Sequence, residues 1–287
     1  MKRRNSAVTA TLVAAAFLLL GLVFGSGSFS RQIPPKPGQT KVVFFNVGDA
    51  DSILILDGSG QNMLIDAGDN AHEDFLVDSI REFGVSRIDI LVLTHPHEDH
   101  IGGADAVIGA FDIGTIYMPQ VEKDSASFRD LLQAADDKKL LFTAAKSGMS
   151  FQLGENEFTI LNPDENAQYS DMNDYSVVLS AQICGKHFYF MGDATDRIET
   201  QLLERGEVSA CDVLKVGHHG SATSSSEEFL KTAAPAYAVV SCDSDGPSSK
   251  TENRLHVIGS KIYVTGIDGT VILTLSEDGI VVETEHE

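Results

Sequence analysis

The chain has 287 residues, of which 43% are apolar, enough to build one large domain or two small ones. Its formal net charge is −21, from 42 acidic and 21 basic residues. A surface this acidic repels polyanions and offers no electrostatic footprint for nucleic acid. An anionic substrate would therefore need a strong local positive charge, and a bound metal ion is one source of it.

The first 40 residues differ from the rest of the chain. Residues 1–6 are basic, residues 7–24 are uncharged and apolar, and residues 25–40 are rich in Gly, Ser and Pro. This layout is typical of an export signal followed by a spacer. The apolar run is about 18 residues, close to the lower limit of a membrane span. A signal anchor is favoured over a cleaved signal peptide. In both cases the basic end is cytoplasmic, and the remainder is extracytoplasmic, either membrane-anchored by one N-terminal helix or secreted.

From Lys41 onward, short apolar runs alternate with turn signals and with segments of helical spacing. In chain order the pattern predicts strands at 41–47, 52–57 and 62–66, a helix at 71–84, a strand at 88–94, a helix at 104–111, a strand at 114–119 and a helix at 125–139. It then predicts strands at 157–163, 175–183 and 186–192, a helix at 196–205, a strand at 211–217, a helix at 225–234, and strands at 236–241, 261–266, 269–276 and 279–284. Composition does not break between the halves. The sequence therefore predicts one α/β domain over residues 41–287, with two facing sheets and helices outside.

Three cysteines, Cys184, Cys211 and Cys242, are an odd number for an exported chain. Two of them lie in or beside apolar runs, which favours small buried side chains. One disulfide with one free thiol is the alternative, and a role as metal ligands is not favoured.

A cluster of histidines and acids, "THPHEDHIGG", follows the strand at 88–94 directly. His95 and His97 are two residues apart, so both imidazoles can turn toward one point, while Asp99 and His100 can face a second point. Imidazole and carboxylate are the usual ligands of Zn²⁺ and similar ions. The alternative is a solvated loop in an inactive domain, but three histidines at this spacing are rare by chance. The cluster therefore predicts a metal site.

Two further motifs place potential ligands at the ends of strands. "FYFMGDAT" places Asp193 after one apolar strand, and "DVLKVGHHGS" places His218 and His219 after another. Taken alone, Asp193 could equally be the N-cap of the next helix. Beside the two histidine motifs, a carboxylate that bridges two ions is the favoured role.

These motifs together resemble the metallo-β-lactamase fold, an αββα sandwich of two facing mixed sheets with outer helices. "FFNVGDADSILI", "MLIDAG" and "LKVGHHGS" resemble more narrowly the metallo-β-lactamase-type domain of the ComEC competence family. The similarity extends to bacterial phosphorylcholine esterases of the same superfamily. It covers the chain from Lys41 to the C-terminus.

The resemblance implies a role for each matching residue. His95 and His97 would bind a first ion, Asp193 would bridge, and the second ion would be bound by Asp99, His100 and one histidine of the pair. His219 is the favoured ligand and His218 the favoured contact to the substrate oxyanion, although the sequence does not separate the two. The expected catalytic residues are Asp99 and His218. Three residues are expected to support the ligands or the substrate: Asp66, which would orient a ligand histidine, Asn173 and Asp51.

The sequence departs from the family pattern at three places. Many relatives have another histidine for the first ion, whereas this chain has Asn173 and Asp174 in that region. A Gly-His-Pro step usual near the C-terminus of ComEC-type chains is absent from "DGPSSKTENRL". In the opening motif Asn46, Asp49 and Ala50 replace the usual Asp, Gln and Gly, and Asp51 is kept.

The function implied is two-metal hydrolysis by a metal-bridging hydroxide whose parent water has a pKa lowered to about 7. The expected cofactors are two divalent ions, Zn²⁺ first and Mn²⁺ second. A phosphodiesterase is favoured, with a ComEC-like DNA nuclease as its narrower form, although the acidic surface counts against long polyanions. The alternatives are a lactone, β-lactam or thioester hydrolase of the same fold, and a non-catalytic surface-binding domain. The expected partners are the substrate and, through residues 7–24, a membrane; no protein partner is predicted.

Overall fold

The computed structural model describes residues 34–286. The basic N-terminal residues, the segment 7–24 and most of the spacer lie outside this range, so the expectation of an export signal is not addressed by it. Within residues 34–286, none of the helices combines the length and the apolar character that a membrane crossing requires.

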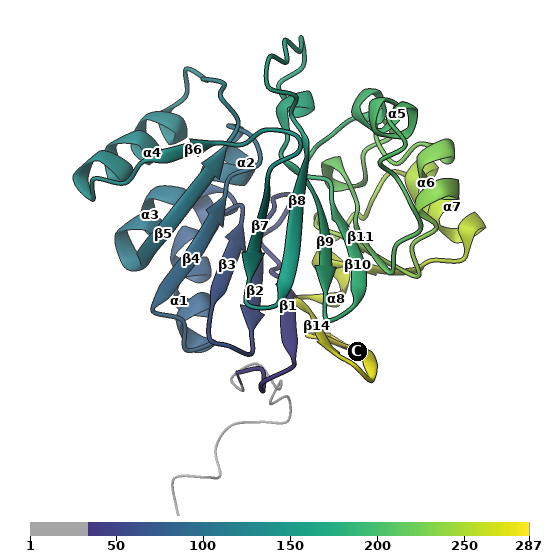
Figure 1. The fold of residues 1–287 in the computed structure, drawn as a ribbon, viewed down its shortest axis with the longest axis horizontal. Coiled ribbons are helices and arrows are strands. Elements are labelled where there is room, and N and C mark those ends of the chain that lie inside the picture. Colours follow the sequence, from purple (N-terminus) through teal and green to yellow (C-terminus); the bar gives the residue numbers. More distant parts are fainter. Residues whose placement is uncertain (1–33, 287) are drawn as a thin grey trace, which may run out of the picture. The chain divides into compact units, whose positions relative to one another are not determined.

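The first sheet has eight strands in the order β15-β14-β1-β2-β3-β4-β5-β6 (Figure 1). Its strands from β3 to β6 pair in parallel, and the others pair antiparallel, so the sheet is mixed. The strands are β1 (Thr40–Phe44), β2 (Ile53–Asp57), β3 (Asn62–Ile65), β4 (Arg87–Val92), β5 (Asp112–Met118), β6 (Phe142–Ala144), β14 (Val271–Ser276) and β15 (Gly279–Thr284).

The second sheet has seven strands in the order β13-β12-β11-β10-β9-β8-β7. Here β10 to β13 pair in parallel and β7 to β10 pair antiparallel. The strands are β7 (Ser150–Leu153), β8 (Asn156–Asn162), β9 (Val178–Ile183), β10 (Lys186–Phe190), β11 (Val213–Lys215), β12 (Tyr237–Val240) and β13 (Lys261–Val264).

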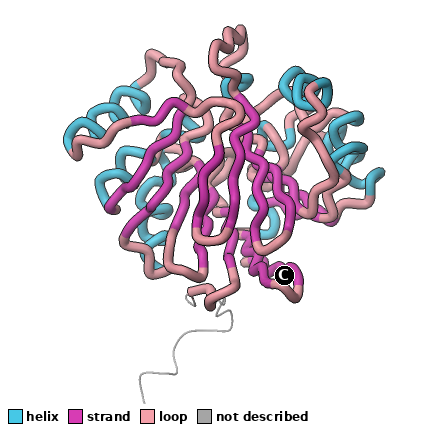
Figure 2. Tube along the Cα trace, viewed as in Figure 1, coloured by secondary structure: helices cyan, strands magenta, loops and turns pink. Residues whose placement is uncertain are grey.

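Helices cover the outer sides of the two sheets, as Figures 1 and 2 show. On the side of the first sheet lie α1 (Glu73–Glu82), α2 (Glu98–Ile101), α3 (Ala104–Ala110) and α4 (Ala126–Asp137). On the side of the second sheet lie α5 (Asp196–Glu204), α6 (Glu227–Ala233) and α7 (Ser249–Ile258), and a short α8 (Thr265–Asp268) follows β13. Residues 34–286 also contain the 3₁₀ turns η2 (Asn70–His72), η3 (Asn173–Tyr175) and η4 (His218–Gly220). The αββα sandwich expected from the sequence is confirmed.

The core explains why the strands are apolar on both faces. Val42 and Phe44 of β1 belong to the cluster between the two sheets, which also contains Leu179 of β9 and Phe190 of β10. Val43 points the other way and is still fully buried. Alternate residues of one strand thus contact the opposite sheet and the outer helices. This burial on both sides fixes the strand ends from which the loops of the site begin.

Most elements match the sequence prediction, and the differences have local causes. The strands β6 and β7 and the helices α2, α7 and α8 were missed, and the strand expected at 261–266 ends at Val264, after which α8 begins. Only two residues of α7, Thr251 and Leu255, are buried, so its apolar periodicity is weak. The helix expected from residue 225 begins at Glu227 and is capped by Ser226. The three cysteines are all free, so the disulfide alternative is wrong.

Candidate metal centre

The three motifs meet at one edge of the sandwich. The histidine cluster follows β4 of the first sheet, while Asp193 follows β10 and the histidine pair follows β11 of the second sheet. Because β10 and β11 are parallel neighbours, their carboxyl ends lie side by side. The structure therefore brings together all six residues that the sequence assigned as metal ligands.

Four of these residues form a compact group, which we call the second-ion group: Asp99, His100, Asp193 and His219. Asp193 Oδ1 lies 3.3 Å from His100 Nε2 and 3.4 Å from His219 Nε2, and His219 Nε2 lies 3.3 Å from Asp99 Oδ2. Within the described residues, His100 Nε2, Asp193 Oδ1 and His219 Nε2 are buried and have no hydrogen-bond partner. Unpaired buried atoms are costly, so three of them converging on one point fit a cation that they would coordinate.

The electrostatics of this group also favour a positive charge at its centre. Burial opposes protonation of His100 and His219, but the neighbouring carboxylates, Asp193 first among them, outweigh it and raise both pKa values, that of His219 to about 10. Burial likewise opposes charge on Asp193, but the two imidazoles hold its pKa well below the ordinary value. Without a metal ion the group therefore draws in protons as counter-charge, which a divalent ion would replace.

A second group, the first-ion group, consists of His95, His97 and Asp193. His95 Nε2 lies 3.0 Å from His97 Nδ1 and 3.8 Å from Asp193 Oδ2. Burial lowers the pKa of both histidines, most strongly that of fully buried His95. Both are therefore neutral near pH 7, the form in which imidazole binds metals. Asp193 offers one oxygen to each group, the geometry of a bridging carboxylate.

Asp66 supports the second-ion group from behind. Its carboxylate accepts hydrogen bonds from Thr94 N and Thr94 Oγ1, each at 2.7 Å, and contacts His100 Nδ1 at 2.8 Å. A proton on Nδ1 of His100 leaves the lone pair of Nε2 facing the group. His219 is oriented in the same way, because its Nδ1 lies 2.8 Å from the carbonyl oxygen of Ser241.

The histidine pair has an unusual backbone. Both His218 and His219 have φ of +50°, the left-handed region that is uncommon for residues other than glycine. Such conformations cost on the order of 1–3 kcal/mol each and cluster at functional sites. The turn directs the two rings differently, with only His219 within the second-ion group.

His218 lies beside the first-ion group. Its Nε2 is 3.9 Å from Asp193 Oδ2 and 3.3 Å from Asn173 Nδ2, and its Nδ1 is 3.1 Å from Thr223 Oγ1. Asn173 Oδ1 is buried without a hydrogen-bond partner in the described structure. Asp174 instead accepts a hydrogen bond from Thr195 Oγ1 of the α5 N-cap at 2.6 Å. Of these two neighbours, Asn173 is the one that faces the centre.

The glycines after the histidine cluster permit a close approach of two loops. A Cβ on Gly102 would lie 2.4 Å from the backbone nitrogen of Asn70, and one on Gly103 would lie 2.5 Å from the carbonyl oxygen of Ala67. The loop that carries Asp66 therefore packs directly against α2, which carries His100. These glycines serve loop packing around the ligands.

A third set of possible ligands, Asp51, Asp66 and His100, lies behind the second-ion group. It already has its counter-charge, because Lys215 Nζ lies 2.6 Å from Asp51 Oδ2 and Asp66 is fully hydrogen-bonded. We therefore assign no ion to it. The sequence analysis missed Lys215, although a lysine inside the apolar strand "DVLKVG" was the signal that could have revealed it.

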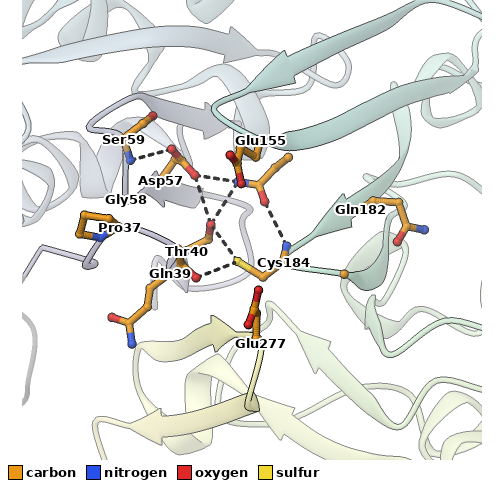
Figure 3. A pocket seen from close by; sticks show the side chains of 13 residues that line it. Pro37, Gln39, Thr40, Asp57, Gly58, Ser59, Glu155, Gln182, Cys184 and Glu277 are labelled. Carbon is orange, nitrogen blue, oxygen red and sulfur yellow. Dashed lines mark hydrogen bonds between the residues drawn. The ribbon is translucent and has the colours of Figure 1, made fainter.

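A separate hollow of about 550 Å³ lies at the edge of the sandwich opposite the metal centre, beside the ends of β1, β2 and β9 (Figure 3). Its polar groups bind one another: Asn156 donates to Thr40 Oγ1 and Asp57 Oδ2, and Cys184 Sγ lies 3.4 Å from Thr40 Oγ1. Among the described residues that line this hollow, no buried side-chain nitrogen or oxygen lacks a hydrogen-bond partner. The metal centre is therefore distinct from this hollow.

Comparison with known proteins agrees with the fold. The family model of the metallo-beta-lactamase superfamily matches residues 46–244. Competence protein ComA of Neisseria gonorrhoeae is 30% identical over 93% of this chain and 36% of its own length. ComE operon protein 3 of Bacillus subtilis is 28% identical over 69% of this chain and 26% of its own length. The chain thus spans little more than a third of these relatives at most.

Among solved structures, Tm1679, a metal-dependent hydrolase of the beta-lactamase superfamily, shares the fold. Its TM-score is 0.55 at 13% identity, over 81% of this chain and 98% of Tm1679. The resemblance to ComEC-type competence proteins expected from the motifs is confirmed by the sequence matches. The chain belongs to the metallo-beta-lactamase superfamily.

Proposed function

We propose that this protein is an extracytoplasmic hydrolase with two divalent metal ions, and that it cleaves phosphodiesters. The observation that carries the proposal is the sharing of Asp193 between two groups of ligand atoms, several of them buried and unpaired. Zn²⁺ fits this set of imidazoles and carboxylates, and Mn²⁺ is the second candidate. His95 and His97 would hold the first ion, and Asp99, His100 and His219 the second.

When bound, the two ions would lower the pKa of a coordinated water to about 7 and neutralise charge that develops on a substrate. The protein's own side chains orient the ligands for this reaction. Asp66 and the Ser241 carbonyl fix the rings of His100 and His219 with Nε2 toward the centre. Asp99 is partly exposed, so its carboxylate lies where it can also accept a proton from an incoming water.

His218 is the proposed contact to the substrate oxyanion. It is partly exposed and lies next to the first-ion group, and Asn173 Nδ2 lies within 3.3 Å of its Nε2. The positive charge of Lys123 is also felt at this site, since burial and then the Lys123 ammonium lower the pKa of His97. A lysine and two divalent ions would attract an anionic substrate despite the acidic composition of the chain.

A phosphodiester fits this local charge better than a neutral ester does. A lactone or thioester places less negative charge next to two cations and a lysine in the ground state. The similarity to competence proteins favours DNA as the narrower substrate class, while the net charge of −21 weighs against long polyanions. The proposed location is outside the cytoplasm, with residues 7–24 as an anchor or signal.

The experiment measures metal per chain in the full-length protein purified without chelator. It also measures hydrolysis of bis-p-nitrophenyl phosphate and of single-stranded DNA, beside an Asp193→Ala control. Two ions per chain and diester cleavage that is lost in the variant would support the proposal. Two ions with cleavage of lactones or thioesters alone would overturn the phosphodiesterase. Failure to bind Zn²⁺ or Mn²⁺ would leave a non-catalytic surface-binding domain.

A further inference from the structure

A salt bridge buried behind the second-ion group joins the two sheets. Lys215 ends β11 of the second sheet, and Asp51 lies in the loop between β1 and β2 of the first. Their Nζ and Oδ2 atoms are 2.6 Å apart, and the side chains are 1% and 2% exposed. Desolvating two such charges often costs as much as their attraction returns, so stability alone does not explain the pair.

Each partner is linked to a ligand of the second-ion group. The backbone N–H of Asp51 donates to the carbonyl oxygen of Asp99 at 3.0 Å. Asp51 Oδ1 lies 3.8 Å from His219 Nδ1 and has no hydrogen-bond partner in the described structure. Lys215 stands four residues before His219 on the same strand and turn, and donates to the carbonyl oxygen of Val216 at 3.0 Å. The salt bridge thus ties the loop that contacts Asp99 to the turn that carries His219.

The first-ion group has no such link. His95 and His97 lie on one loop, and the Nδ1 atom of His95 lies beside the hydroxyls of Thr94 and Ser176, at 3.2 Å and 3.4 Å. Among the described residues, neither histidine forms a hydrogen bond or ion pair with Asp51 or Lys215. A defect in the salt bridge would therefore act on one ion more than on the other.

We infer that Lys215 and Asp51 are positioning residues for the second ion. Asp99 follows a strand of the first sheet and His219 a strand of the second, and the salt bridge holds the two ligands at the spacing that a single ion requires. The inference rests on the two-ion centre of the proposed function but not on the identity of the substrate. The inference predicts that removal of Lys215 weakens metal binding, which is the opposite of what simple electrostatics predicts. A nearby ammonium repels cations, so its removal alone would strengthen metal binding; loss of a positioning residue weakens it.

The test is Zn²⁺ titration of the chelator-treated, full-length protein by calorimetry, with wild type compared with Lys215→Met. The two binding steps are assigned with Co²⁺, whose absorption spectrum reports the ligand geometry. We expect the second step to weaken by about tenfold or more in Lys215→Met, while the first step changes little. The Asp51→Asn/Lys215→Met double variant should recover part of this loss, because it leaves no unpaired buried charge.

Glu199→Gln is the matched control. Glu199 is another fully buried carboxylate, but it accepts hydrogen bonds from the backbone N–H groups of Ser225 and Ser226, away from the ligands. Its loss should lower stability without changing either binding step. If Lys215→Met does not fold, Asp51→Asn replaces it, because the amide keeps the carboxylate's shape, and the second step should again weaken selectively.

Unchanged or tighter second-ion binding in a folded variant would overturn the inference. Equal weakening of both steps, as from a general loss of stability, would overturn it too. Both results would leave the proposed function intact. A wild-type protein that takes up no ion would overturn the proposed function together with the inference, so the two failures are distinguishable.

Discussion

Asp66 Oδ2 lies 2.8 Å from Nδ1 of His100, and both side chains are essentially fully buried. The residues are 34 positions apart and meet because the loop after β3 packs against α2. The contact fixes which nitrogen of His100 carries the proton, and it leaves Nε2 unpaired at 3.3 Å from Asp193 Oδ1. The orientation of a ligand is thus set by a residue that itself would not touch the metal.

Asp66→Asn should weaken binding of the second ion by about 10–100-fold, because the amide removes the charge that holds the Nδ1 proton. Zn²⁺ titration of the chelated protein measures this. Asp69→Asn is the control, since Asp69 makes a similar contact to His72 at 2.7 Å in a partly exposed position. Equal affinities in the two variants would refute the role given to Asp66.

His218→Ala should retain both ions and lose activity. Removal of one group that stabilises an oxyanion typically lowers kcat by about 10²–10³-fold. Metal content per chain and the separate values of kcat and KM for bis-p-nitrophenyl phosphate provide the measurement. Loss of one ion from the variant would instead make His218 a ligand of the first ion, whose Asp193 oxygen lies 3.9 Å away.

Lys123→Ala should raise KM for the diester several-fold and leave metal content unchanged. The Lys123 ammonium lowers the pKa of His97, second to burial, so its charge acts on the first-ion group. The effect should diminish at high salt because exposed charges are screened over about 10 Å at 0.1 M ionic strength. Lys231→Ala, which removes an exposed lysine paired with Glu227, is the control. A KM equal to that control would contradict the prediction.

Metal removal should make stability fall at alkaline pH. Burial opposes protonation of His219, but Asp193 and Asp99 outweigh it and raise its pKa from an ordinary 6.5 to about 10. The stabilisation is therefore fully present below pH 6.5 and is lost as pH rises toward 10. We expect the free energy of unfolding of chelated protein to fall by on the order of 4 kcal/mol over this range.

Urea unfolding of the chelated protein at several pH values, beside His219→Gln, tests this prediction. The glutamine cannot titrate, so the difference between the two proteins isolates the histidine. Zn²⁺-loaded wild type should show a smaller dependence, because a bound ion replaces the proton. A difference that does not change with pH would show that His219 keeps an ordinary pKa.

Leu179→Ala should destabilise the sandwich. Leu179 is fully buried between the two sheets, and a truncation of this kind costs about 2–5 kcal/mol. Val281→Ala is the control, because Val281 is 62% exposed and should change stability by less than about 0.5 kcal/mol. Denaturant unfolding measures both, and equal values would show that the two sheets do not pack through Leu179.

The sequence predicted the parts of this molecule that depend on neighbours along the chain. The histidine cluster, Asp193 and the histidine pair each follow an apolar strand, and strand ends are visible in the local pattern. Taken alone in the sequence, Asp193 could have been either a metal ligand or the N-cap residue of the next helix. The structure gives the cap of α5 to Thr195, whose hydroxyl accepts from the backbone N–H of Arg197, and leaves Asp193 free to face both ligand groups.

The parts that were missed depend on partners far along the chain. Lys215 meets Asp51 across 164 positions, and no local pattern links them. The edge strands β6 and β7 are short and only partly buried, so their apolar signal is weak. Burial can be inferred from composition and period, whereas the pairing of buried charges requires the tertiary structure.

The second-ion group has two members from each half of the chain: Asp99 and His100 lie more than 90 positions before Asp193 and His219. Neither half can assemble it alone, and contacts between residues so far apart in the sequence form slowly. Uptake of an ion by this group would therefore follow the docking of the two sheets. In refolding, the rate of that uptake would report the docking of the two sheets, and no proteolytic fragment that lacks either sheet would retain the ion.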